Sequence, residues 1–292
     1  MKTKIASTRT LPFELGEARS FGGLTIVPLF PARAPEVGYV GLDEAVARGL
    51  TVSEVGGGVV EALLLENPLS ERVLLYEGEE LLGAKQNRIV ERTILVEARS
   101  TLKIPVNCVE QGRWAWGSAR LAPAPQTAYP ELRLALRHGQ HAVWESVAAK
   151  QGRFAVHAPT GAAEAIYRSR DAELDEYLRA LPRLPGQAGA LVAIAGRVCC
   201  LDYVSRSEVF AGLYRKLLRG YALDALERPV ERPLSKAAVG RFLGELELAD
   251  RAWRPAVGLG EEGRFAGYAV GSELVVEGEV LALGAFRAAT SR

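Results

Sequence analysis

The sequence predicts an α+β fold with a mainly antiparallel, sandwich-like sheet, built by strands from both ends of the chain with about four helices inserted between them. Three observations support this prediction. Residues 13–118 contain short apolar runs separated by Gly, Pro or Asn, a pattern typical of strands. Residues 131–250 carry apolar side chains mostly at helical spacing, and residues 264–287 return to the strand pattern. We therefore expect residues 1–292 to form a single domain.

The strand-rich half is expected to contain several strands and a short helix. The helix covers residues 42–48, because Asp43 can cap its start and Gly49 suits the left-handed residue that closes a helix. Residues 121–130 are rich in proline, which neither a helix nor a central strand accommodates, so they are expected to cross the surface as a loop. The expected strands cover residues 24–30, 59–65, 72–76, 87–97 and 101–109.

The second half is expected to be mostly helical around a hairpin. Residues 189–204 form two apolar runs on either side of Gly196, which predicts two strands joined by a turn. Ser205 and Glu208 have the spacing of a capping box, in which each side chain bonds a free amide at the start of a helix. The expected helices cover residues 132–147, 166–181, 205–221 and 235–248.

Composition and charge exclude several classes of protein. Hydrophobic residues make up 48% and charged residues 24% of the chain, which is the balance of a globular protein with a packed core. The net charge of +1 supplies no long-range field for nucleic acid or an anionic membrane, so neither is an expected partner. The polar, basic start and the lack of a long apolar run argue against a signal peptide or a membrane-spanning helix. Cys108, Cys199 and Cys200 are expected to be reduced thiols of a cytoplasmic protein.

Three near-matches to known motifs carry little weight. Residues 258–263 read GLGEEG, but two carboxylates stand where the pyrophosphate of a dinucleotide would lie. Residues 78–85 read GEELLGAK, but Ala84 displaces the lysine of a P-loop and no Ser or Thr follows it. His138 and His141 can share a helix face, yet no third metal ligand is near them in sequence. The sequence supports no metal or dinucleotide motif, and the cofactor is unknown.

The residues with the clearest functional pattern lie between residues 78 and 114. Alternate residues from Leu102 to Cys108 share one face of a strand, and Glu110 continues that face at its end. Because a buried carboxylate without a partner is costly, Glu110 must be paired, protonated or coordinated. Cys108 is expected to be a small buried hydrophobe, with a nucleophilic role as the alternative.

Four consecutive polar residues form the second part of this cluster. Adjacent side chains of a regular strand face opposite ways, so the four converge only where the backbone is irregular, and Gly83 is the residue expected to allow this. A converged set would suit a phosphate or carboxylate, with Trp114 or Trp116 stacking on a base or sugar. The four residues are Lys85, Gln86, Asn87 and Arg88.

The alternative for these residues is a surface hairpin without a ligand. Lys85 and Arg88 would then form exposed ion pairs worth about 0–1 kcal/mol each, and Trp114 would belong to the core. Their exposed partners would be Glu79, Glu80 and Glu91.

Several strings of the sequence resemble one bacterial family, the ADP-ribosylglycohydrolase and rhodanese-phosphatase associated protein domain. The resemblance covers most of the chain, favours a site over the surface hairpin, and implies a role in the metabolism of ADP-ribose or other NAD-derived nucleotides. A histidine expected in the last strand of many relatives is absent here, where residues 280–286 are apolar. The matching strings are GEELLGAKQNRIVERTILV, IPVNCVEQGRW, FGGLTIVPLF, YVGLDEAVARGLTVSEV and GRVCCLDYVSRSEVFAGLYRKLLRGYALDAL.

The preferred hypothesis is a cleft that binds, or a hydrolase that processes, an ADP-ribose-like phosphosugar or nucleotide. Glu110 and Glu80 are the candidate catalytic residues, because glycosidic cleavage commonly uses two carboxylates about 5–9.5 Å apart. A non-catalytic module that binds a ligand or a protein is the alternative, and metal-dependent hydrolysis through Cys108, Glu110 and a histidine is a third hypothesis. The candidate ligand-binding residues are Lys85, Gln86, Asn87, Arg88, Arg113 and Trp114.

Overall fold

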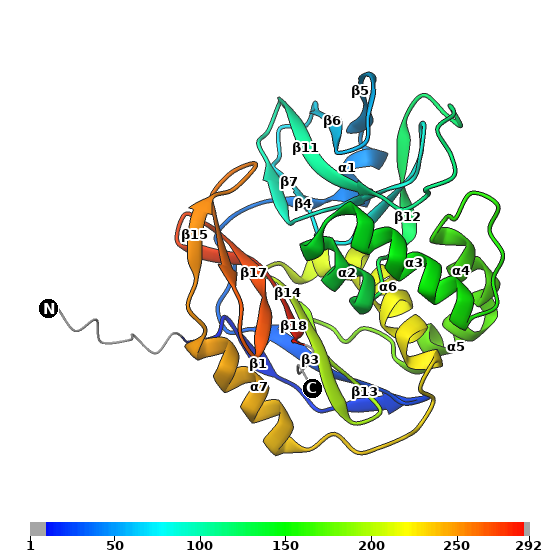
Figure 1. The fold of residues 1–292 in the computed structure, drawn as a ribbon. Helices are drawn as coiled ribbons and strands as arrows, with labels where there is room; N and C mark the ends of the chain where they lie inside the picture. Colours follow the sequence, from blue (N-terminus) through cyan, green and yellow to red (C-terminus); the bar gives the residue numbers. More distant parts are fainter. Residues whose placement is uncertain (1–9, 289–292) are drawn as a thin grey trace, which may run out of the picture.

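The computed structural model describes residues 10–288. Its largest element is one nine-stranded antiparallel sheet with strands from both ends of the described chain, which confirms the predicted α+β class and the origin of its sheet (Figure 1). The predicted hairpin near residues 189–204 is also confirmed. The strand order is β1 (Phe13–Leu15), β3 (Leu24–Pro31), β13 (Gly189–Ile194), β14 (Arg197–Val204), β18 (Glu279–Arg287), β17 (Ala269–Val276), β16 (Glu261–Phe265) and β15 (Ala252–Pro255), with β2 (Arg19–Phe21) paired to β3.

Helices cover both faces of this sheet. In β3, Ile26 belongs to the core around α6 (Ser207–Leu226), whereas its neighbour Val27 belongs to the core around α7 (Lys236–Leu248). This alternation follows from the pleat of a strand, in which successive side chains point to opposite faces. Helix α6 is buried along most of its length, because it also packs on β12 (Leu121–Thr127), a strand outside this sheet. It therefore links the large sheet to the other strands of the molecule.

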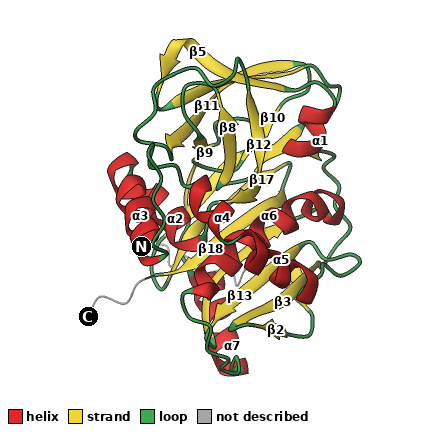
Figure 2. Ribbon diagram, turned by 90° about the vertical axis from the view of Figure 1, so that its right-hand side faces the viewer, coloured by secondary structure: helices red, strands yellow, loops and turns green. Residues whose placement is uncertain are grey.

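The second group of strands comes from residues 40–127 and lies at the opposite end of the molecule from the larger sheet (Figure 2). Its core is aliphatic and includes the buried side chains of Leu63, Ile104 and Val106. One sheet has the order β12 (Leu121–Thr127), β8 (Glu79–Gly83), β9 (Arg88–Val90), β11 (Ser100–Cys108), β6 (Ala62–Asn67) and β5 (Thr51–Val59), and the other has the order β10 (Ile94–Val96), β7 (Val73–Leu75) and β4 (Val40–Gly41).

The described residues form seven α-helices, which are the short helix expected at residues 42–48 and six helices in place of the expected four, because two of those four are broken. One breaks at Gly139, whose φ of +87° favours glycine, and the other at Arg170, whose φ and ψ of −123° and 21° are not helical. No helix in the described range is long and apolar enough to cross a bilayer. The remaining helices are α1 (Leu42–Ala47), α2 (Pro130–Ala135), the 3₁₀ turn Leu136–His138, α3 (Gln140–Arg153), α4 (Glu164–Ser169) and α5 (Asp171–Ala180).

Three local predictions are wrong. The proline-rich residues 121–130 contain strand β12, which tolerates prolines because it lies at the edge of its sheet and pairs only with β8. The expected strand 87–97 is divided at residues 91–93 into β9 and β10, which belong to different sheets. At this break Thr93 Oγ1 accepts a hydrogen bond from the backbone amide of Glu77. Ser205 does not cap α6, because its hydroxyl is hydrogen-bonded to Tyr39 at 3.0 Å and the helix begins after Arg206.

A fully buried ion pair lies where the two strand groups and the helices meet. Asp202 of β14 accepts two hydrogen bonds from the Arg133 guanidinium of α2, at 2.7 and 2.9 Å. Its two oxygens also accept from the hydroxyls of Tyr76, at 2.7 Å, and Tyr221, at 2.6 Å. All four residues are at most 2% exposed. The partners of Asp202 therefore come from two helices and from Tyr76, just after β7 in the second group of strands.

Candidate functional site

The four polar residues 85–88 lie at the turn between β8 and β9, and the backbone is irregular at its start. Gly83 and Ala84 have φ values of +120° and +44°, in the left-handed region that most side chains avoid. A Cβ on Gly83 would lie 2.9 Å from the carbonyl oxygen of Arg120, so glycine is required there for space as well as for conformation. The turn sends the consecutive side chains in different directions.

Lys85 lies beside two exposed tryptophans. Its Nζ is 4.9 Å from the ring centre of Trp114 and 5.3 Å from that of Trp116, within the range of cation–π attraction. The same ammonium donates to the carbonyl oxygen of Gly57, in the glycine-rich end of β5. Trp114 and Trp116 are 48% and 58% exposed. Trp114 is therefore not a core residue.

Arg88 extends from the turn into the interior and is 0% exposed. Its Nη1 donates to Gln86 Oε1 at 3.0 Å, and its Nη2 lies 3.7 Å from Glu54 Oε1. Burial lowers the pKa of this guanidinium. The Nε and Nη2 atoms have no hydrogen-bond partner among the described residues, which leaves donor capacity on a buried cation.

Both carboxylate oxygens of Glu110 accept hydrogen bonds, and Oε2 also forms an ion pair. Oε2 lies 2.6 Å from Arg113 Nη2 and accepts from the Asn87 amide at 3.1 Å, while Oε1 accepts from Thr160 at 2.9 Å. Burial opposes ionisation of this carboxylate, but the ion pair and hydrogen bonds outweigh it and lower its pKa. Arg113 also donates to the carbonyl oxygen of Ala84 at 2.7 Å, so it fixes the turn and the carboxylate together.

Glu80, on β8, has the opposite electrostatic character. It is 2% exposed and accepts one hydrogen bond, from Gln126 at 2.7 Å, while its Oε1 has no partner within residues 10–288. Burial raises its pKa to about 8, and the nearby charges of Glu164 and Glu110 add to the shift. The pKa values of these two carboxyl groups are therefore shifted in opposite directions.

Comparison with known protein families identifies the family to which the chain belongs. The family model of ARPP-1, the ARG and Rhodanese-Phosphatase-superfamily-associated Protein domain, matches residues 12–286. The chain belongs to the ARPP-1 family. This confirms the family that the sequence strings indicated. No curated protein and no solved structure is significantly similar to the chain.

The ARPP-1 structure brings most of the candidate residues into contact through this turn. Gln86 pairs with Arg88, Asn87 with Glu110 and Arg113, and Lys85 with Trp114, whereas Glu80 is held by Gln126. The exposed-hairpin alternative is wrong, because Arg88, Glu79 and Glu80 are buried. Sequence reasoning missed Glu54, Gln126 and Thr160. Thr160 contacts Glu110 from 50 positions away along the chain, and no local sequence pattern marks that contact.

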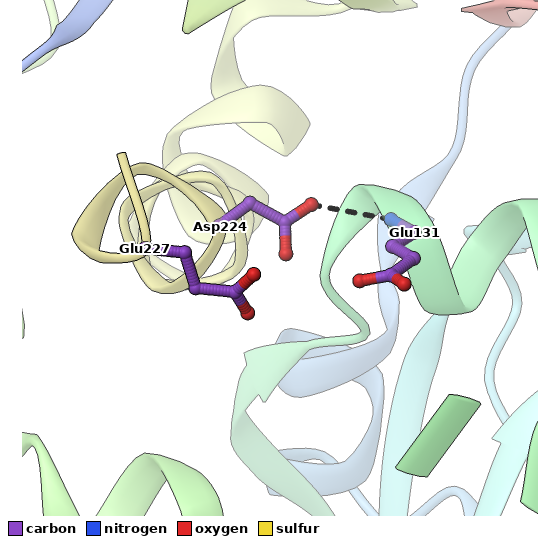
Figure 3. Close-up of side chains that lie close together, drawn as sticks. All are labelled: Glu131, Asp224 and Glu227. Atoms are coloured by element: carbon purple, nitrogen blue, oxygen red, sulfur yellow. Dashed lines mark hydrogen bonds between the residues drawn. The ribbon is translucent and has the colours of Figure 1, made fainter. Parts of the chain in front are cut away.

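Cys108, Glu110 and a histidine do not form a group of possible metal ligands among the described residues. Cys108 is fully buried, burial raises the pKa of its thiol, and its backbone amide and carbonyl are both bonded to Gln140. His141 is exposed and contacts Glu145 on its own helix. Within the described range, the three groups close enough to share an ion are Glu131 of α2 and Asp224 and Glu227 at the C-terminal end of α6, and Glu110 is not among them (Figure 3).

Proposed function

We propose that this ARPP-1 protein binds an ADP-ribose-like phosphosugar or another NAD-derived nucleotide at the surface around Lys85. The observation that carries the proposal is the Lys85 ammonium beside two exposed indoles. An indole face stacks on a base or sugar, and an ammonium beside it attracts phosphate. The association of the family with the ARG and rhodanese-phosphatase superfamilies supports this ligand class.

Buried donors beneath this surface support the proposal further. The guanidinium of Arg88 lies 5.8 Å from the ring centre of Trp114, so the unpartnered nitrogens of Arg88 are close to the stacking surface. A buried cation with free donors is costly unless a water or a ligand satisfies it. A phosphate or ribose hydroxyl that reached Arg88 past the indole would meet this requirement.

Replacing Trp114 with alanine is expected to weaken binding of ADP-ribose by roughly 5- to 150-fold, because stacking of one base on an aromatic side chain contributes about 1–3 kcal/mol. Lys85→Gln should weaken binding as well, and should reduce its dependence on salt concentration. Isothermal titration with ADP-ribose and NAD would measure both effects. Arg88→Ala is a poor test, because it removes a fully buried side chain and would disturb the fold.

The matched control is Trp253→Ala, since Trp253 is 44% exposed on β15 and lies outside the proposed site. This variant should bind like the wild type. Wild-type protein that binds neither ADP-ribose nor NAD, or a Trp114→Ala variant with unchanged affinity, would refute the proposed site.

Hydrolysis of the bound ligand is the second candidate function. It is favoured by the opposite pKa shifts of Glu80 and Glu110, which resemble the acid and base of a glycosidase. Both carboxylates are buried, so cleavage requires a local opening that admits the ligand. If hydrolysis occurs, Glu80→Gln should abolish product formation and preserve ADP-ribose binding. If no product forms with wild-type protein, the non-catalytic module is the correct alternative.

A further inference from the structure

A second candidate site lies away from the Lys85 surface. It is a cavity of about 490 Å³, bounded by α2, α3, the C-terminal end of α6, the β13–β14 hairpin and the end of β18. This volume falls within the range of small-molecule sites, about 300–1,000 Å³. No residue of the Lys85 surface lines it. A ligand in this cavity would therefore be independent of the function proposed above.

One wall of the cavity is an ion-pair network that is already complete. The Nζ of Lys150 lies 2.7 Å from Asp224 and 3.2 Å from Glu131, and it also pairs with Glu227. Arg153 pairs with Glu131 at 2.5 Å and with Glu227 at 3.0 Å. Burial opposes the charge of Lys150, but the carboxylates outweigh it and raise its pKa. The ammonium occupies the place that a cation would take between these carboxylates, so the cluster does not indicate a metal site.

Cations without such partners also line the cavity. Arg197, at the start of β14, and Arg228, just after α6, are exposed and line the cavity. Neither side chain has a hydrogen bond or ion pair with another described residue, in contrast to Arg153. Arg287 also lines the cavity, and its guanidinium lies 5.5 Å from the ring centre of Tyr268. With the carboxylates of the first wall largely neutralised, the cavity has a surplus of positive charge.

The remaining surface is apolar and includes one thiol. Leu134, Ile194 and Val198 supply apolar contact beside the arginines. Cys199 reaches the cavity because it is the extra residue of a β-bulge, where Val192 pairs with Cys200 and Ala193 with Val198. Its Sγ lies 3.7 Å from that of Cys200, which is fully buried. An apolar wall beside an anion-binding wall suits a ligand with a carbon body as well as a charged group.

We propose that this cavity binds a small phosphate monoester of the sugar phosphate class, with Arg197, Arg228 and Arg287 holding the phosphate. A guanidinium presents paired N–H donors that match two phosphate oxygens, and three of them offset the two negative charges of a monoester. The carbon skeleton would lie on the apolar wall near Cys199. The neutralised network of Lys150 lets an anion approach without repulsion from three free carboxylates.

The test is calorimetric titration of the full chain with ribose 5-phosphate and with inorganic phosphate, at constant ionic strength set with chloride. Arg197→Gln and Arg228→Gln should each weaken binding roughly tenfold, the effect of losing one charge-assisted contact. Both side chains are exposed, so neither change should alter folding. Arg241→Gln, which removes an exposed arginine from α7, is the matched control and should bind like the wild type. Tighter binding of the ester than of inorganic phosphate would confirm the contribution of the apolar wall.

Protection of Cys199 from alkylation would show that the ligand binds in this cavity. Cys108 and Cys200 are fully buried, so iodoacetamide should modify native protein at Cys199, and ribose 5-phosphate should slow that reaction. Trp114→Ala should leave both binding and protection unchanged, which separates this site from the Lys85 surface. The proposal is overturned if neither phosphate compound binds saturably, if the two arginine variants bind like wild type, or if bound ligand does not protect Cys199.

Discussion

Asp202→Ala is expected to lower the free energy of unfolding by about 3–5 kcal/mol, one of the largest effects that a single substitution can have on this chain. The substitution leaves the Arg133 guanidinium buried without its counter-ion and removes the acceptor of the Tyr76 and Tyr221 hydroxyls. A buried, unpaired cation is costly because it has lost its hydration. Urea denaturation, followed by far-ultraviolet circular dichroism, would measure the change.

An exposed ion pair provides the control. Arg168→Ala removes a contact to Glu164 within one helix, where the side chain of Arg168 is 71% exposed, and should cost at most about 0.5 kcal/mol. Tyr221→Phe should have an intermediate effect, because it removes one hydrogen bond to a charged acceptor and retains the ion pair. If Asp202→Ala costs no more than Arg168→Ala, the buried network does not stabilise the fold as we infer.

Glu80→Gln is expected to change how stability depends on pH. The folded protein holds the Glu80 proton up to a pKa of about 8, whereas the unfolded chain releases it near the ordinary value of 4.5. Between these values the folded state binds more protons than the unfolded state, so this group makes the wild type less stable as pH rises. Glutamine has no proton to release. The stability of the variant relative to wild type should therefore increase by roughly 3–5 kcal/mol between pH 4 and pH 8.

The measurement is a set of urea unfolding curves for both proteins from pH 4 to pH 8. The amide of glutamine can still accept the hydrogen bond from Gln126, so the local geometry should be kept. Glu262→Gln is a useful comparison, since the arginines around Glu262 lower its pKa and its contribution should run in the opposite direction. Parallel curves for wild type and Glu80→Gln would show that the Glu80 pKa is not raised.

Part of the sheet structure could be predicted from the sequence, because strand signals are local. Alternating or continuous apolar runs identified β3, β11 and the β13–β14 hairpin close to their observed bounds. Strand β12 could not be found in this way, because prolines exclude a strand from a sheet interior and only the fold shows that these residues lie at an edge. The broken helices show the same limit, since the helical spacing of apolar residues continues across Gly139 but the helical backbone conformation does not.

The candidate site could be located but not fully described from the sequence. Glu110 is buried, as strand parity predicted, but Asn107 and Val109 of the opposite parity are buried as well, and the backbone is irregular at Gly83. The partners of these residues lie far along the chain, as Thr160 does for Glu110. Burial of Glu80 likewise depends on Gln126 and on the packing of β12. Such contacts form between elements, and no single element carries a signal for them.

The strand order of the large sheet bears on how the chain folds. Strand β14 lies between β13, its immediate predecessor, and β18, which follows it only after α6, α7 and three further strands. Strand β3 must likewise wait for β13, where Leu24 pairs with Ile194. Closing such long loops is entropically costly and slows folding. We expect the amides that bond β3 to β13 and β14 to β18 to become protected from hydrogen exchange late during refolding, after the amides that bond β13 to β14 within their local hairpin.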